Sequence, residues 1–146
     1  MTALLQVSNN ETIAPTADRV LRQLISSIAR ELGLGKKLAE QAAEVGTMRI
    51  DGIYVSISCL ETDLHQDAII VAKLPVELQA DSIRQLLEIN LIAAIALHAS
   101  IAINSDGEAI LLSTLPINQT NALMFARHIS QLVLFALTVQ QQVSKT

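Results

Sequence analysis

Two Asp-Gly dipeptides, Asp51-Gly52 and Asp106-Gly107, each stand between two short runs of apolar and β-branched residues. Asp-Gly between such runs is a strong signal for a tight β-hairpin, because the turn requires positive φ angles that these residues tolerate. The run after the first dipeptide alternates between apolar and mostly polar residues, as a strand does when one face is buried. Its apolar face carries Ile53, Val55, Ile57 and Cys59. We therefore expect antiparallel strands, with Cys59 as a buried and inert thiol.

Apolar residues at helical spacing flank these hairpins on both sides. A first helix is expected from Thr16 to Leu32, before glycines that favour the left-handed conformation common at helix ends. Further long helices are expected over residues 79–97 and 118–142, and residues 36–45 could form a short one. A third strand, AIIVAKL, precedes Pro75. The coarse order is α-β-β-β-α-β-β-α, and the expected fold class is α+β, a twisted antiparallel sheet packed by helices.

The chain of 146 residues has the length of one domain. We expect that domain at residues 16–142, a flexible N-terminal arm at 1–15 and a frayed C-terminus at 143–146. The start lacks the basic residues and apolar centre of a signal peptide, and no apolar run approaches the roughly 20 residues that span a bilayer. A single cysteine fits a reducing compartment. These features predict a cytoplasmic protein without membrane insertion.

Composition disfavours several functional classes. The formal net charge is −4, whereas binding nucleic acid without sequence preference needs a basic surface. Hydrophobic residues make up 51% of the chain and charged residues only 16%. The second half of the helix at 79–97 is apolar almost all round, so it must be covered on both sides. In a chain this short, we expect another subunit to supply the second cover.

Catalytic motifs are missing from the sequence. It contains neither a phosphate-binding loop nor a nucleophile elbow, and His98 and His128 have no paired ligand four residues away. The best polar cluster shares one face of an extended segment and consists of Glu61, Asp63, His65 and Asp67. It lacks the glycine and the closing glutamate of a calcium loop, so a solvated hairpin connection is favoured over a metal site. We expect no catalytic, cofactor-binding or metal-binding residues.

Several strings, in this order, resemble the class I type III secretion chaperones, the Tir-chaperone-like family. LISSIARELGLG is similar to their first helix, and MRIDGIYVSI to their first hairpin. LLEINLIAAIALHASIAINSDGEAILLSTLPI is similar to their most recognisable stretch, and 118–142 to their last helix. The resemblance covers about residues 17–142. It implies a bacterial cytoplasmic homodimer without cofactors. Such a chaperone binds the N-terminal segment of a secreted effector, keeps it soluble and secretion-competent, and serves the export apparatus indirectly.

The candidate site residues follow from this implied mechanism, in which the effector adds a strand to a sheet edge and places apolar side chains in pockets. The expected dimer interface consists of Leu87, Leu91, Ala94 and Ile95. The expected effector-binding residues are Leu21, Ile25 and Ile28 on the first helix, with Val55 and Ile57 on the second strand. For each of these residues the alternative is a role in the core of the single chain.

Two other functions remain open at this point. The first is a small dimeric adaptor similar to roadblock or longin domains, which would have only two strands between residues 46 and 78. The second is a small enzyme without a cofactor, which would have a closed cavity lined by a few polar groups with perturbed pKa values.

Overall fold

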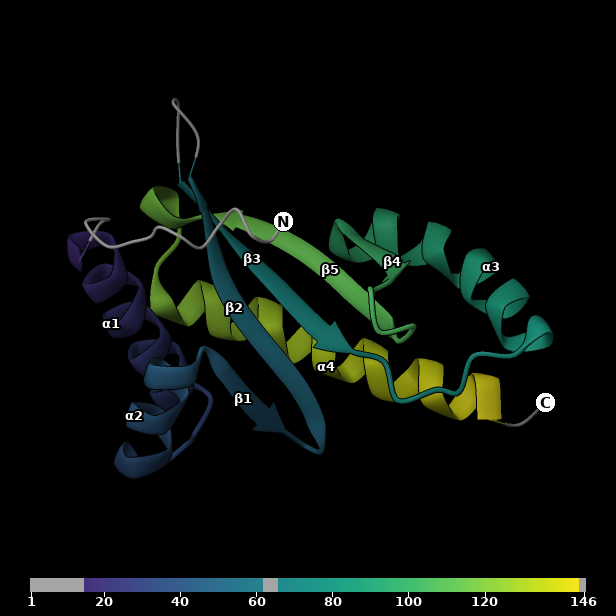
Figure 1. Ribbon diagram of the computed structural model, residues 1–146, viewed down its shortest axis with the longest axis horizontal. Coiled ribbons are helices and arrows are strands. Elements are labelled where there is room, and N and C mark those ends of the chain that lie inside the picture. The colour runs from purple at the N-terminus through teal and green to yellow at the C-terminus, as the bar shows by residue number, and fades with distance from the viewer. Residues whose placement is uncertain (1–14, 62–65, 145–146) are drawn as a thin grey trace.

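The computed structural model describes residues 15–61 and 66–144, with side chains described from residue 19 to residue 143 outside that gap. The strands form a single sheet, and helices pack on it (Figure 1). The elements in chain order are α1 (Pro15–Glu31), α2 (Lys36–Val45), β1 (Thr47–Ile50), β2 (Ile53–Glu61), β3 (Gln66–Lys73), α3 (Ala80–Leu97), β4 (Ala99–Ile103), β5 (Ala109–Pro116), the short 3-10 helix η2 (Ile117–Gln119) and α4 (Ala122–Ser144).

The sheet has five strands in the order β1-β2-β3-β5-β4, and every neighbouring pair is antiparallel. The α+β class is thus confirmed, with residues 36–45 forming the additional helix α2. Three strands lie between residues 46 and 78, not the two of a roadblock-like or longin-like adaptor. Strands β1 and β4 are the two edges of the sheet.

Both predicted Asp-Gly turns join antiparallel neighbours. Asp51 and Gly52 have φ values of 51° and 84° and connect the paired residues Ile50 and Ile53, so this hairpin has the tight turn that Asp-Gly favours. The second turn is organised by Asn104, whose Oδ1 accepts hydrogen bonds from the backbone N–H groups of Asp106 (3.0 Å) and Glu108 (2.9 Å). These turns fix the register of β1 on β2 and of β4 on β5.

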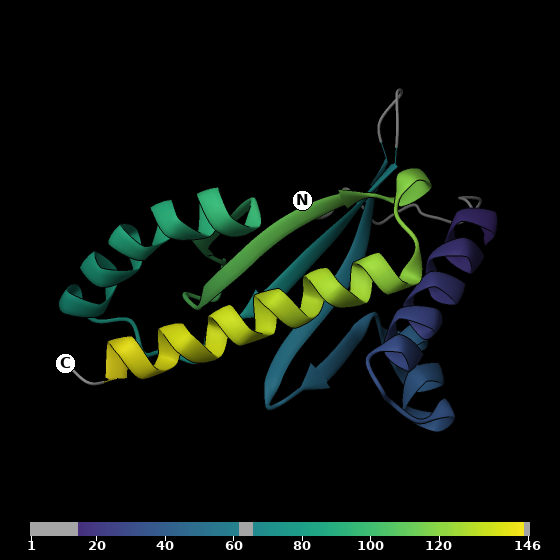
Figure 2. The same ribbon diagram turned by 180° about the vertical axis from the view of Figure 1, so that it is seen from behind.

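Helices α1 and α4 cover one face of the sheet, as seen from behind in Figure 2. The alternating residues of β2, β3 and β5 that point to this face are buried, including Val55, Ile70 and Leu111. Phe125 and Leu132 of α4 are buried against them. Within the described residues, Ala122–Val143 is the one helical stretch long and apolar enough to cross a membrane by length and composition. Its packing on the sheet buries part of this apolar surface, including Phe125 and Leu132.

Cys59 corrects one prediction, because its side chain is exposed and not buried. The inward alternation of β2 ends at Ile57, and the last four residues of the strand are all exposed. The last residues of β2 and the first residues of β3 extend beyond α1 and α4 (Figure 1). Partial burial, followed by the charges of Glu61 and Asp67, raises the pKa of the Cys59 thiol. The thiol is therefore kept in its protonated, weakly nucleophilic form.

Gly46 ends α2 in the left-handed conformation, with a φ of 80°. A Cβ atom there would lie 3.2 Å from the backbone oxygen of Ile57. We expect Gly46→Ala to lower the free energy of unfolding by about 1–2 kcal/mol, because the substitution adds backbone strain and a close contact. Urea denaturation measures this loss. Gly52→Ala, where the φ is also positive but the space is open, separates strain from crowding. An equal loss in both variants would contradict a contribution from the close contact.

Candidate functional site

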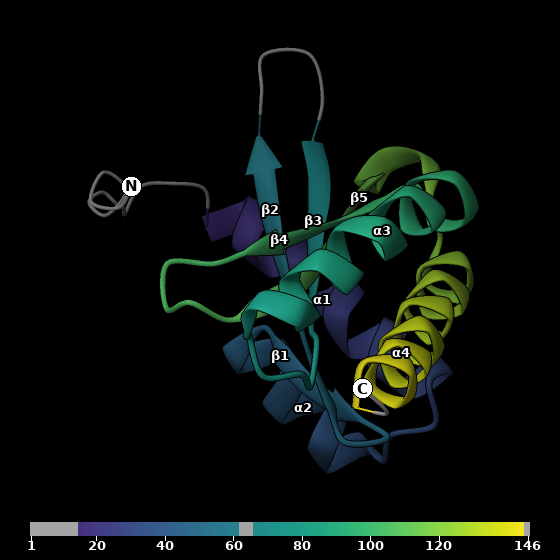
Figure 3. The ribbon, with the colours of Figure 1, turned by 90° about the vertical axis from the view of Figure 1, so that its right-hand side faces the viewer.

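Helix α3 presents an exposed apolar face. Leu87, Leu91 and Ile95 are 68%, 66% and 71% exposed, and Ala94 beside them is exposed as well. The opposite side of the helix buries Leu86 and Ala93 against the rest of the molecule. Figure 3 looks onto this end, where α3 lies close to β4. The structure thus brings together all four residues predicted for a dimer interface and leaves them uncovered in the single chain.

The apolar surface continues from α3 onto β4 through a shallow groove of about 50 Å³. Its lining residues come from both elements and are Ile83, Leu86, Leu87, Asn90, Ile101, Ala102 and Ile103. We call this groove and the exposed apolar residues of α3, including Ile92, the α3–β4 surface. A partner that covers α3 would therefore also contact the edge of the sheet.

Asn90 closes part of that edge. Its side-chain Oδ1 accepts a hydrogen bond of 2.7 Å from the backbone N–H of Ile101. Asn104 N–H bonds to Glu108 O at the end of this hairpin, and bonded pairs alternate along an antiparallel ladder. This alternation turns the N–H of Ile101 away from β5, toward the outer edge. The sequence analysis assigned no role to Asn90. The sequence signal that could have indicated this role is the position of Asn90 as the one polar residue in the apolar run INLIAAIAL.

Strand β1, by contrast, has an open edge. Ile57 donates its N–H to the carbonyl of Gly46 at 2.8 Å, so Gly46 and Ile57 form a hydrogen-bonded pair. Because such pairs occur at every second residue of an antiparallel ladder, Met48 and Ile50 are the residues of β1 whose backbone groups bond to β2. The backbone groups of Thr47 and Arg49 consequently point away from the sheet. Such unpaired N–H and C=O groups form a template for one more strand.

A larger groove runs along this open edge, with a volume of about 410 Å³. Its lining residues come from α2, the turn before it and β1, and are Leu34, Leu38, Gln41, Ala42, Val45, Thr47, Met48 and Arg49. We call it the α2–β1 groove. Leu38 and Val45 are 55% and 74% exposed beside it. They stand seven residues apart on α2, a spacing that could have indicated an exposed apolar stripe from the sequence.

The predicted effector-binding residues lie mostly elsewhere. Ile25, Ile28, Val55 and Ile57 are buried in the core, and only Leu21 is partly exposed. These four buried residues therefore have the alternative role considered from the sequence, that of core residues of the single chain. Val55 pairs with Met48 in the sheet, so it supports the floor of the α2–β1 groove. A ligand would contact these four side chains only if the core opened.

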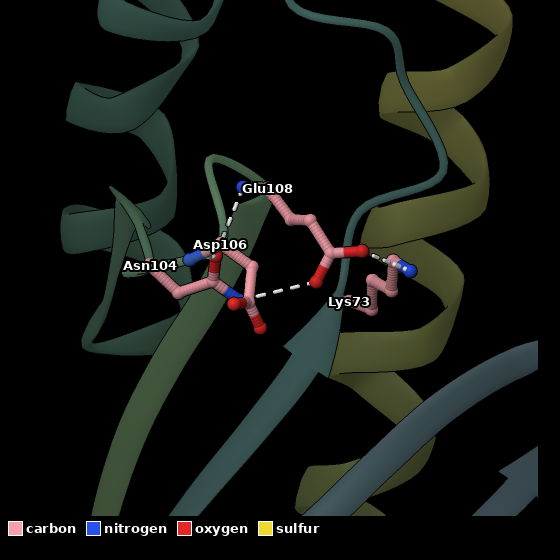
Figure 4. A network of polar contacts seen from close by, with 4 residues as sticks. All are labelled: Lys73, Asn104, Asp106 and Glu108. Carbon is pink, nitrogen blue, oxygen red and sulfur yellow. Dashed lines mark hydrogen bonds and ion pairs between the residues drawn. The ribbon is translucent and has the colours of Figure 1, made fainter.

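Charged side chains lie on the sheet face opposite the helices. The guanidinium of Arg49 lies over the ring of Tyr54, 5.0 Å from its centre. Lys73 Nζ forms an ion pair of 2.5 Å with Glu108, which also accepts a hydrogen bond of 3.2 Å from the Asn104 amide (Figure 4). The hydrogen bond from Lys73 is the main reason that the pKa of Glu108 is lowered. This network ties β3 to the turn between β4 and β5.

Ser113 and His128 form a polar contact beneath the sheet. The hydroxyl of buried Ser113 lies 2.7 Å from Nε2 of His128 and 3.4 Å from the carbonyl oxygen of His98. Burial lowers the pKa of His128, and the neighbouring His98 lowers it further. Among the described residues, the recorded polar contacts of His128 include no acidic side chain that would orient the imidazole. A serine and a histidine on their own are more typical of a structural contact than of a catalytic one.

This contact predicts a dependence of stability on pH. The unfolded chain binds a proton on His128 at a higher pH than the folded chain does, so protonation favours unfolding. The contribution of neutral His128 to the free energy of unfolding is fully present above the pKa of histidine in the unfolded chain, about 6.5. This contribution is lost as the pH falls from there toward the lower pKa of His128 in the folded chain. We expect His128→Gln to flatten this loss, measured as urea midpoints between pH 7.5 and pH 5. Identical pH profiles for both proteins would contradict the assignment.

In the part of the chain that the structure describes, no three His, Cys, Asp or Glu side chains are placed to hold a metal ion. Of the polar cluster considered from the sequence, Asp63 and His65 lie outside the described residues. Glu61 accepts a hydrogen bond of 2.7 Å from Gln66, across the end of the β2–β3 hairpin.

Comparisons with known proteins agree with this fold. The model of the Tir chaperone protein (CesT) family matches residues 23–139, which is most of the chain. A chain in the structure of the HopA1–SchA chaperone–effector complex is similar in fold, with a TM-score of 0.63, 13% identity, and coverage of 86% of this chain and 97% of that one. A chain in the crystal structure of the Yersinia pestis type III secretion chaperone SycH, in complex with a stable fragment of YscM2, is also similar in fold. Its TM-score is 0.56 and its sequence identity 22%, and the match covers 82% of this chain and 98% of that one. A search of curated proteins finds no match.

Proposed function

Because the chain belongs to the Tir chaperone protein (CesT) family, we propose that it acts as a cytoplasmic chaperone in a bacterium with type III secretion. It binds the N-terminal segment of a secreted effector, keeps it soluble and secretion-competent, and does so without catalysing a reaction. The observation that carries this proposal is the open edge of β1 beside the exposed apolar residues of the α2–β1 groove. An unfolded segment needs both features, since its backbone and its apolar side chains must be satisfied together.

The proposed mode of binding is strand addition on β1. The backbone groups of Thr47 and Arg49 would bond to the effector, while its apolar side chains would lie in the α2–β1 groove. Each side chain that is fully buried there contributes about 1.5–3 kcal/mol, and ordering the segment cancels part of this gain. Strand β4 is the less suitable edge because Asn90 already occupies the N–H of Ile101.

The proposed assembly is a homodimer formed through the α3–β4 surface. Three large apolar side chains, Leu87, Leu91 and Ile95, are about two-thirds exposed on one helix. Leaving them in water would forgo several kcal/mol of hydrophobic stabilisation. A twofold axis at this surface would cover the same side chains on both copies. The two open β1 edges would then lie away from the interface and stay available to the effector.

Co-expression with the product of the neighbouring gene tests this function. We expect that product to co-purify through its N-terminal segment. Val45→Glu, which places a charge beside the α2–β1 groove, is expected to abolish the interaction. Leu134→Glu is the matched control, because Leu134 is 67% exposed on α4 and does not line the groove. Equal binding by Val45→Glu and wild type would refute the proposed site.

A further inference from the structure

We propose that the α2–β1 groove selects extended segments in which an acidic residue stands between two apolar residues. The inference rests on the proposed function, since it assumes that a strand of the client is added along β1. It goes beyond that function by naming the local sequence chemistry that the site prefers. The residue that sets this preference is Arg49.

An added strand would present its side chains alternately to the two faces of the sheet. The groove is lined by Leu38 and Val45 of α2 together with Met48, whose side chain is buried on the helix-covered face. Every second side chain of the added strand would therefore enter an apolar environment. The side chain between two such anchors would point to the opposite face, where Arg49 lies beside Tyr54.

Arg49 is the only charged residue among the eight that line the groove. Among the described residues, the structure records no carboxylate in ion-pair contact with it; its recorded partner is the ring of Tyr54. Lys73, the other cation near this face, is already paired with Glu108. A guanidinium stacked on a ring keeps N–H donors free at its edge, and these donors suit a carboxylate.

Distance also favours this contact. Directly opposed residues on neighbouring strands have Cβ atoms about 4.5–5.5 Å apart, within reach of an arginine and an aspartate or glutamate. The chain as a whole carries a net charge of −4, so a general attraction for acidic peptides is not expected. A preference for an acid would therefore report the local position of Arg49.

Selection from a peptide library tests the inference. Random 12-residue peptides displayed on phage are selected against the full chain, once as wild type and once as Arg49→Glu. Wild type is expected to enrich peptides with Asp or Glu between two apolar residues, and Arg49→Glu to enrich Lys or Arg at the same place. Arg127→Glu is the control, because Arg127 is exposed on α4 and does not line the groove. It should select the same peptides as wild type.

Affinities of one enriched peptide then separate this inference from the proposed function. Replacing its acid by alanine should weaken binding to wild type by about threefold to tenfold, as expected for a charge-assisted contact, and should change binding to Arg49→Glu little or strengthen it. Loss of binding in Val45→Glu together with no effect of the acid overturns the acidic preference and leaves strand addition in place. Binding that survives Val45→Glu unchanged, or a library that enriches no peptide, overturns both.

Discussion

Leu91→Asp is expected to convert the protein from a dimer to a monomer at micromolar concentration in sedimentation velocity. Leu91 lies at the centre of the four residues predicted for the interface and is 66% exposed in the single chain. A carboxylate at this position would have to lose its hydration inside an apolar seam, which costs several kcal/mol when no partner charge is present. A loss of 4 kcal/mol corresponds to roughly a thousandfold weaker association.

The same substitution on another exposed leucine provides the control. Leu134 of α4 has a similar exposure of 67% but lies outside the α3–β4 surface. Leu134→Asp should sediment as wild type does, and both variants should keep the helical circular-dichroism signal because neither site is buried. A Leu91→Asp protein that remains dimeric would show that α3 is not the interface, whatever the family relationship.

Asn90→Leu is the second variant with a large expected effect. Leucine is close to asparagine in size but cannot accept the hydrogen bond from Ile101 N–H, which then lies partly buried without a partner. An unsatisfied backbone donor of this kind costs about 1–3 kcal/mol, so the urea midpoint should fall. We expect Asn90→Asp to keep most of the stability, because its carboxylate retains an acceptor at the same place.

The comparison of these two variants distinguishes the hydrogen bond from simple packing. If Asn90 acts mainly by filling space, Asn90→Leu should be as stable as wild type and Asn90→Asp should be the weaker variant, since it brings a charge close to apolar neighbours. If the hydrogen bond to Ile101 matters more, Asn90→Asp should be more stable than Asn90→Leu. Hydrogen exchange at the Ile101 amide gives an independent measurement, because a protected amide should become exchangeable in Asn90→Leu alone.

The sequence predicted the features that depend on local pattern. Asp51-Gly52 and Asp106-Gly107 lie at hairpin turns because their backbone preferences act within a few residues. The exposed face of α3 was also predictable, since a helix that is apolar all round cannot be covered by a single sheet edge. Helix α4 ends at Ser144, two residues past the predicted end, as helix boundaries commonly do.

Features that depend on where distant elements meet were not predictable. The alternation of β2 continues to Cys59 in sequence, but the helices that cover the strand end before it, so burial stops at Ile57. The α2–β1 groove exists because the small residues Ala39 and Ala42 bury one side of α2, leaving Leu38 on the rim. The contact of Asn90 with Ile101 joins residues of different elements, and periodicity within one helix carries no information on it.

The two sheet edges differ, because a side chain bonds to the backbone of β4 whereas the edge of β1 is open. This difference limits how these molecules can associate with one another. Open-ended fibres need two complementary free edges on every subunit, so that each copy can add to the last. With the Asn90 side chain on the N–H of Ile101 at the β4 edge, β1 is the more open template among the described strands, and β1 meeting β1 of another copy is a closed pair. The edge proposed to bind the effector can therefore stay uncovered without making the protein a repeating unit of a polymer.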